Sequence, residues 1–171
     1  MRTSVIPSGA SLPTLYRSLA GDYPKFFKMD TACRLGFLLA EMLAKEDTDR
    51  FTPRTDRAIL FFSHEGSQLT DRNYAETIKD FPSPAIFVYT IPNTVTGEIA
   101  IRNKWAGETG AYVLPEFDGV RILELIREAF QDGETSSVMA AWSDCRSDEE
   151  WTAKAWLIER NEIEQIKELS L

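Results

Sequence analysis

The stretch GETGAYVLPEFDG, residues 107–119, predicts a turn, a strand and a helix start around which the rest of the fold can be placed. Residues 111–114 are short and apolar, a pattern that favours a buried strand. Asp118 is of a type preferred at helix N-caps, and apolar residues follow it at helical spacing. We therefore expect a helix over residues 119–130.

The residues before this stretch alternate between helical and strand patterns. The strongest strand signal is residues 58–62 (AILFF), an unbroken apolar run that is typical of a central strand covered on both faces. Ser11 is expected to open a short helix after an extended lead over residues 1–10. Apolar residues at helical spacing predict three further helices, at residues 23–45, 70–79 and roughly 93–105.

The residues after the 119–130 helix add two more strands. Residues 138–142 and 152–159 have strand patterns, and the charged connection between them predicts an antiparallel hairpin. Residues 160–171 are expected to form a short amphipathic helix. Because no repeat, linker or low-complexity segment separates these elements, residues 1–171 are interpreted as a single α/β domain with a mixed sheet.

The composition is that of a globular protein with an acidic surface. Hydrophobic residues make up 43% of the 171 residues, and 27 Asp and Glu against 19 Lys and Arg give a net charge of −8. The basic residues are scattered, so neither nucleic acid nor a membrane is an expected partner. No apolar run approaches the ~20 residues of a membrane span, and the first residues do not resemble a signal peptide, which favours a cytoplasmic location.

The sequence offers few residues for catalysis or metal binding. Its single histidine, His64, follows the strand at 58–62, a place where ligands gather in α/β sheets. Cys33 is expected to be a packed helix residue and Cys145 an incidental loop residue. These residues are too few and too widely separated for a zinc site, so no metal is expected. Four acidic residues are interpreted as a solvated loop: Asp144, Asp148, Glu149 and Glu150.

Neither glycine-containing segment has the pattern of a nucleotide-binding loop. Residues 64–67 (HEGS) contain one glycine beside an acidic residue. Residues 107–110 (GETG) precede a strand, whereas a phosphate-binding loop precedes a helix. No cofactor is expected.

The order of motifs between residues 92 and 144 carries a family resemblance. The matching pieces are, in order, Pro92-Asn93, Gly97, Gly107, the strand at 111–114, Gly119 with its helix, and the small-residue strand that ends in Asp144. This order, over roughly residues 24–144, resembles the N-terminal half of β-ketoacyl synthases (3-oxoacyl-ACP synthases), enzymes that extend acyl chains on acyl carrier protein. The resemblance implies an α/β, thiolase-like half domain with a mixed five-stranded sheet and helices on both faces.

The family's nucleophilic cysteine is replaced in this sequence. In the family it lies nine residues after the glycine that corresponds to Gly107 and three before the one that corresponds to Gly119, and both counts lead to Glu116. A helix N-terminus lowers the pKa of a cysteine and activates it, whereas it only stabilises the carboxylate of Glu116. The family's other catalytic residues, two histidines or a histidine and an asparagine, belong to a C-terminal half and are expected to be absent.

The favoured hypothesis is a non-catalytic subunit, similar to the family's chain-length factors, that acts in fatty-acid or polyketide-type acyl-chain synthesis. It would form a homodimer or pair with a full ketosynthase, and acyl carrier protein is a further expected partner. By resemblance, the strand at 111–114 and the helix at 93–105 would face that partner. The resemblance places six residues in the pocket or interface: His64, Asn93, Gly97, Gly107, Phe117 and Gly119.

Two other hypotheses stay open. In the first, Glu116 acts as a general base, assisted by His64, in the decarboxylation or hydrolysis of an acyl thioester. In the second, the chain is an unrelated α/β binding domain. A sheet that differs from the thiolase-type five-stranded sheet would favour that second alternative.

Overall fold

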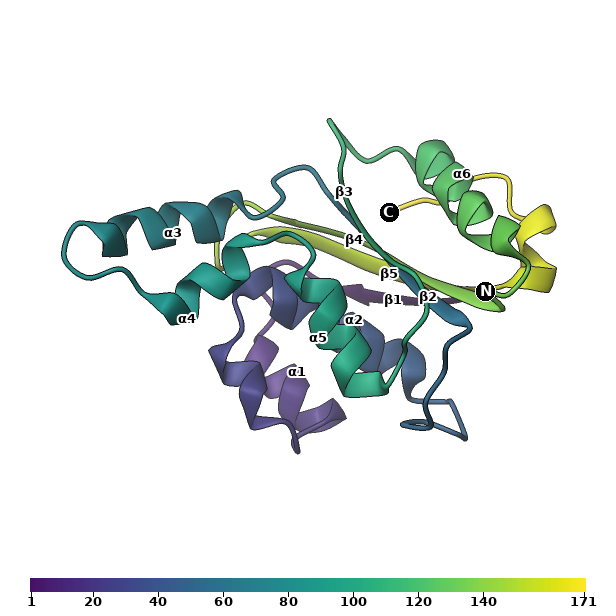
Figure 1. Cartoon of the computed structure of the whole chain (residues 1–171), viewed down its shortest axis with the longest axis horizontal. Helices are drawn as coiled ribbons and strands as arrows, with labels where there is room; N and C mark the ends of the chain where they lie inside the picture. Colours follow the sequence, from purple (N-terminus) through teal and green to yellow (C-terminus); the bar gives the residue numbers. More distant parts are fainter.

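A mixed sheet of five strands, in the order β1-β5-β4-β2-β3, forms the centre of the computed structural model, which describes residues 1–171 (Figure 1). Strand β2 pairs in parallel with both β3 and β4, whereas β5 pairs antiparallel with β4 and with β1. The hairpin expected between the last two strands is therefore confirmed. The strands are β1 (Arg2–Ile6), β2 (Arg57–Ser63), β3 (Thr109–Val113), β4 (Ser137–Cys145) and β5 (Trp151–Glu159).

Helices cover both faces of this sheet, as expected for a thiolase-like half domain. Helix α6 lies on one face, and α1, α2 and α5 lie on the other (Figure 1). The α-helices are α1 (Leu12–Leu19), α2 (Thr31–Ala44), α3 (Gln68–Ile78), α4 (Pro84–Phe87), α5 (Thr94–Asn103) and α6 (Gly119–Ala129). None of them is long and apolar enough to cross a membrane.

Strand β2 is the buried centre that its apolar sequence predicts. All seven of its residues are buried, because it has a neighbour on each side and helices above and below. Its side chains alternate between two cores: Ile59 and Phe61 pack with α2 and α5, and Leu60 and Phe62 pack with α6. The period of two between faces explains why a continuous apolar run suits this position.

The long helix expected over residues 23–45 is two separate elements. A short 3₁₀ helix, η1 (Pro24–Lys28), is followed by α2, and the two are separated at Asp30. The Asp30 carboxylate accepts a hydrogen bond of 2.9 Å from the N–H of Cys33, so that Asp30 is the N-cap of α2. The single helix that the hydrophobic spacing predicted is therefore interrupted at Asp30, where α2 begins.

Two other expectations need correction. The strand expected to be buried at 111–114 is β3, an edge strand with exposed ends, because only β2 pairs with it. The N-terminal lead is extended as expected, and its residues Arg2–Ile6 form the other edge strand, β1. After β5 the chain forms a 3₁₀ helix, η4 (Arg160–Gln165), and then continues without helical structure, in place of the amphipathic helix expected.

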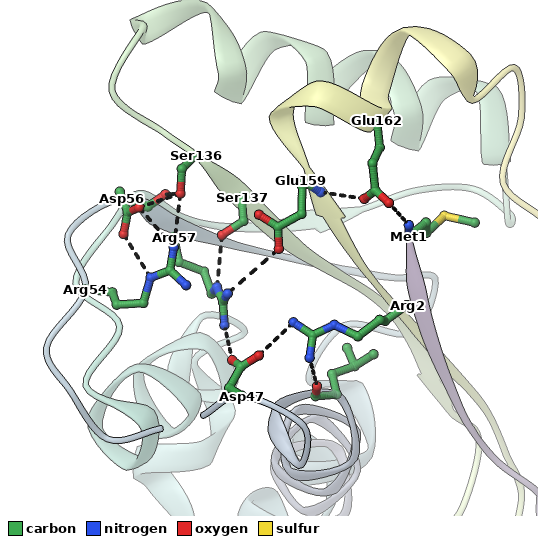
Figure 2. Close-up of polar contacts among 11 residues, drawn as sticks. Met1, Arg2, Asp47, Arg54, Asp56, Arg57, Ser136, Ser137, Glu159 and Glu162 are labelled. Carbon is green, nitrogen blue, oxygen red and sulfur yellow. Dashed lines mark hydrogen bonds and ion pairs between the residues drawn. The ribbon is translucent and has the colours of Figure 1, made fainter. Parts of the chain in front are cut away.

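A buried arginine joins the elements at the amino end of β2. The side chain of Arg57 is 2% exposed, and it donates to Asp47 at 2.7 Å and to Ser137 at 2.9 Å (Figure 2). Its guanidinium also lies 4.7 Å from the ring centroid of Trp105. Arg2 of β1 binds the same Asp47 at 2.7 Å. Burial raises the pKa of Asp47, but the hydrogen bonds from both arginines outweigh burial and leave its pKa below the usual value.

Candidate functional site

The carboxyl ends of three parallel strands lie together at one end of the sheet. His64 follows β2, Glu116 follows β3 by three residues, and Asp144 is near the end of β4. Because these strands run in the same direction, the segments that leave them come together, as ligand sites do in α/β sheets. This end is opposite to the Arg57 cluster.

Asp144 holds the loop that carries the histidine. Its Oδ1 accepts hydrogen bonds from the backbone N–H groups of His64 and Glu65, at 2.9 and 2.7 Å. Gly66 turns the loop with a φ of +57° and donates its N–H to the Ser63 hydroxyl at 3.1 Å. Asp144 is 9% exposed, which corrects its interpretation as part of a solvated acidic loop. The two backbone N–H donors satisfy the carboxylate in this buried position.

The ring of His64 faces the end of β3. Its Nδ1 lies 3.2 Å from the carbonyl oxygen of Leu114, two residues before Glu116. A carbonyl can only accept a hydrogen bond, so this contact requires the hydrogen on Nδ1; in the neutral imidazole, Nε2 is then the nitrogen that carries none. The structure therefore brings the histidine next to the segment that carries Glu116.

Glu116 itself is exposed and lies outside the helix that follows it. Asp118 is the N-cap of α6, and its Oδ1 accepts from the N–H groups of Val120 at 3.1 Å and Arg121 at 2.9 Å. The side chain of Asp118, and not that of Glu116, thus receives the free donors of the helix. No hydrogen bond joins the Glu116 carboxylate to the helix, so any stabilisation of it there stays a prediction.

Three residues expected in a pocket or interface are packing residues of the chain. Gly107 precedes β3 at the opposite end of the sheet, where a Cβ would lie 2.3 Å from the carbonyl oxygen of Arg57. Phe117 packs edge-to-face on Trp142, with 5.4 Å between ring centroids. Gly119 lies against the backbone of the C-terminal segment. Packing within the chain therefore explains why these residue types occur at the three positions, and no ligand is needed to explain them.

The other two expected residues lie at the start of α5 and within it. Asn93 is the exposed residue that precedes the helix, and its carbonyl oxygen accepts from the Thr96 hydroxyl at 2.8 Å. Gly97 is within the helix, and a Cβ there would meet no atom within 4 Å. No contact inside the chain therefore requires a glycine at this position.

Both cysteines are buried and unsuited to nucleophilic chemistry. Cys33 is 3% exposed on α2, and burial raises its pKa well above the usual value. Cys145 is at the end of β4, 5% exposed, where burial raises its pKa to about 12. This placement corrects the expectation of a loop position for Cys145. Reactive cysteines are accessible thiolates, and neither residue meets that requirement.

Comparison with protein-family models gives no match, and comparison with curated protein sequences gives none either. Solved structures do match. The ketosynthase ApeO in complex with its chain length factor ApeC, from Xenorhabdus doucetiae, contains a chain that matches with a TM-score of 0.63 at 12% identity. The match covers 93% of this chain and 77% of that one.

Two further structures have the same fold over part of their length. The ishigamide ketosynthase/chain length factor matches with a TM-score of 0.69 at 14% identity, over 85% of this chain and 48% of that one. A β-ketoacyl synthase from Burkholderia phymatum STM815 matches with a TM-score of 0.55 at 13% identity, over 86% and 47%. The chain spans about half the length of these two proteins. The fold is that of a ketosynthase or chain-length-factor half domain, as the sequence resemblance implied.

Proposed function

We propose that this chain is a non-catalytic β-ketoacyl-ACP-synthase-like subunit that pairs with a ketosynthase in fatty-acid or polyketide-type acyl-chain synthesis. The observation that carries the proposal is the free edge of β3, beside which large apolar side chains are exposed. Val113 on β3 is 60% exposed, and Ile91, just before α5, is 48% exposed. Both line one hollow together with Ala111 and Val95.

The backbone of β3, as well as its exposed side chains, could bind a protein partner. Because β3 pairs with β2 alone, the N–H and C=O groups on its other side are available to another chain. Helix α6 differs from the β3 edge, because its outer side carries exposed charged residues that water can solvate: Arg121, Glu124 and Glu128. The β3 edge and α5 are also the elements that the family resemblance assigns to the partner.

The replaced nucleophile supports a non-catalytic role. Glu116 occupies the place that the resemblance gives to the catalytic cysteine, and both cysteines of the chain are buried elsewhere. The solved complex of ApeO with its chain length factor provides a precedent for such a pair at the level of the fold. The proposal includes acyl carrier protein as a partner of the assembled pair.

A charge at the free edge should weaken pairing strongly. We expect Val113→Asp to weaken the complex with the proposed ketosynthase partner by about thirtyfold or more, the effect of a central interface residue. The desolvation of an unpaired carboxylate is the physical reason. Co-expression followed by gel filtration with light scattering, and titration of the purified proteins, measures the effect.

The matched control is Val120→Asp, on the outer side of α6. Val120 is 49% exposed, so both variants place a carboxylate on an exposed valine, and V120D should still pair. A second copy of this chain in place of the ketosynthase would support the homodimeric form of the proposal. A wild-type chain that stays monomeric and ignores the ketosynthase would contradict it, and so would a V113D variant that pairs normally.

Thioester decarboxylation or hydrolysis is the second candidate, favoured by the free Nε2 of His64 beside the segment of Glu116. If Glu116 is the general base, Glu116→Gln should lower the hydrolysis rate of an acyl-coenzyme A thioester by about a hundredfold or more. Glu65→Gln, in the neighbouring loop, is the control. A wild-type chain without hydrolysis above background, or an E116Q variant as active as the wild type, would refute this role.

A further inference from the structure

Helices α3 and α4 project beyond one end of the sheet (Figure 1). Together with the 3₁₀ helix η2 (Val88–Thr90) they make up residues 68–91, which we call the arm. Within the arm, Tyr74 of α3 packs on Phe87 of α4 with 5.3 Å between ring centroids. A cavity of about 450 Å³ lies between the arm and the segments around α1 and the start of α2. The arm is therefore a distinct unit with open space beneath it.

The two helices of the arm bury almost none of their residues. Helix α3 buries one residue of 11, Thr70, and the four-residue α4 buries none. By contrast, α2 buries 11 of its 14 residues and α6 buries six of its 11. Short helices are marginal in water by themselves, because most of their stability comes from packing of an apolar face. The chain itself leaves α3 and α4 without that packing, so we expect it to come from another molecule.

Large apolar side chains are exposed on the arm. Twelve large hydrophobic residues of the chain are exposed, and five of them lie within residues 78–91: Ile78, Phe81, Phe87, Val88 and Ile91. Phe81, between α3 and α4, is 78% exposed, the largest value among the twelve. Exposed apolar residues that occur singly are normal, whereas their concentration in one segment indicates a surface that binds another protein.

The arm continues into the free edge of β3, and this continuity indicates which protein covers it. Ile91, the last residue of the arm, lines the same hollow as Val113 of β3. Val88 lies about one turn before Ile91, and both are half exposed. A chain that lies along β3 and covers this hollow therefore lies beside the arm as well.

We propose that the arm packs against the ketosynthase partner, so that the interface has a second contact region outside the β3 edge. The partner is the ketosynthase of the proposed function, on which this inference rests. The partner surface that fits the arm is apolar, because Phe81, Phe87 and Val88 have no polar group to offer and gain by leaving water. Contact with that surface gives α3 and α4 the packing that they lack in the isolated chain.

Hydrogen exchange followed by mass spectrometry, on the isolated chain and on its complex with the proposed ketosynthase partner, tests the arm directly. In the isolated chain, amides of α3 and α4 should exchange at least about a hundredfold faster than those of α2, because little burial keeps these helices closed. In the complex, exchange in the arm should slow by about tenfold or more, together with that of β3. Exchange in α6 should stay unchanged.

Phe81→Asp tests the contact through affinity. We expect the complex of this variant to be weaker by about tenfold or more, because pairing would bury a carboxylate without a partner. Its urea midpoint as an isolated chain should equal that of the wild type, because Phe81 is exposed and packs little within the chain. Val120→Asp, on the outer side of α6, is the matched control and should pair as the wild type does.

The outcomes separate the arm from the pairing itself. The arm is excluded, and pairing is left intact, if V113D weakens the complex while F81D binds as tightly as V120D and exchange in the arm does not slow. If no complex with the ketosynthase forms, pairing is contradicted and the role of the arm with it. Self-association of the isolated chain that F81D abolishes would place a second copy on the arm and would also overturn the proposal.

Discussion

Replacing Arg57 by leucine should lower the free energy of unfolding by about 3–5 kcal/mol, the usual effect of breaking a buried ion pair. The substitution leaves Asp47, whose side chain is 12% exposed, with Arg2 as its remaining cation. It also removes the donor to Ser137 and the contact with Trp105. Because a domain of this size is stable by only about 5–15 kcal/mol, the loss is a large part of the total.

Arg54→Leu is the matched control for this effect. Arg54 also pairs with an aspartate, Asp56 at 3.0 Å, and donates to a serine, Ser136 at 3.1 Å, so the chemistry is the same (Figure 2). Its side chain is 23% exposed, however, and that of Asp56 is 39% exposed, so the loss should stay below about 1 kcal/mol. Urea unfolding at neutral pH measures both. Equal losses would show that burial of Arg57 does not set the strength of its contacts.

The sequence predicted the elements whose signals are local. The apolar run at 58–62, the Asp118 cap and the alternation in β5 each depend on a few neighbouring residues, and each is present in the structure. Arg57 could not be found in this way. It extends the apolar run by one charged residue, and its burial depends on Asp47 and Ser137, which the fold brings from other elements.

In the candidate site, too, the sequence predicted what depends on neighbouring residues and missed the contacts that the fold creates. The order of elements was enough to place His64 after β2, at the carboxyl end of the parallel strands, where ligand sites form in α/β sheets. The role of Asp144 could not be read from its neighbours, since its donors His64 and Glu65 are about 80 residues away in the chain.

The family resemblance assigns both Gly119 and Gly97 to the pocket or interface, but alanine should change stability in opposite directions at the two positions. At Gly119 a Cβ would lie 1.9 Å from the carbonyl oxygen of Leu169, a buried residue of the C-terminal segment, so this segment must leave α6. We expect Gly119→Ala to cost about 2–3 kcal/mol, as overpacking against backbone does. At Gly97 the Cβ meets nothing within 4 Å, and Gly97→Ala should stabilise the helix by about 0.5–1 kcal/mol.

Gly97→Ala should also affect pairing, and in the direction opposite to its effect on stability. If α5 faces a ketosynthase, as proposed, the open space beside Gly97 is where the partner approaches, and a methyl group there should weaken the complex. Gly97→Ala would then raise the urea midpoint of the isolated chain while lowering its affinity in the titration that tests V113D. Packing within one chain cannot produce that combination, because no atom of the chain lies near the added methyl group. A G97A variant that is more stable and pairs as tightly as the wild type would place the partner elsewhere than on α5.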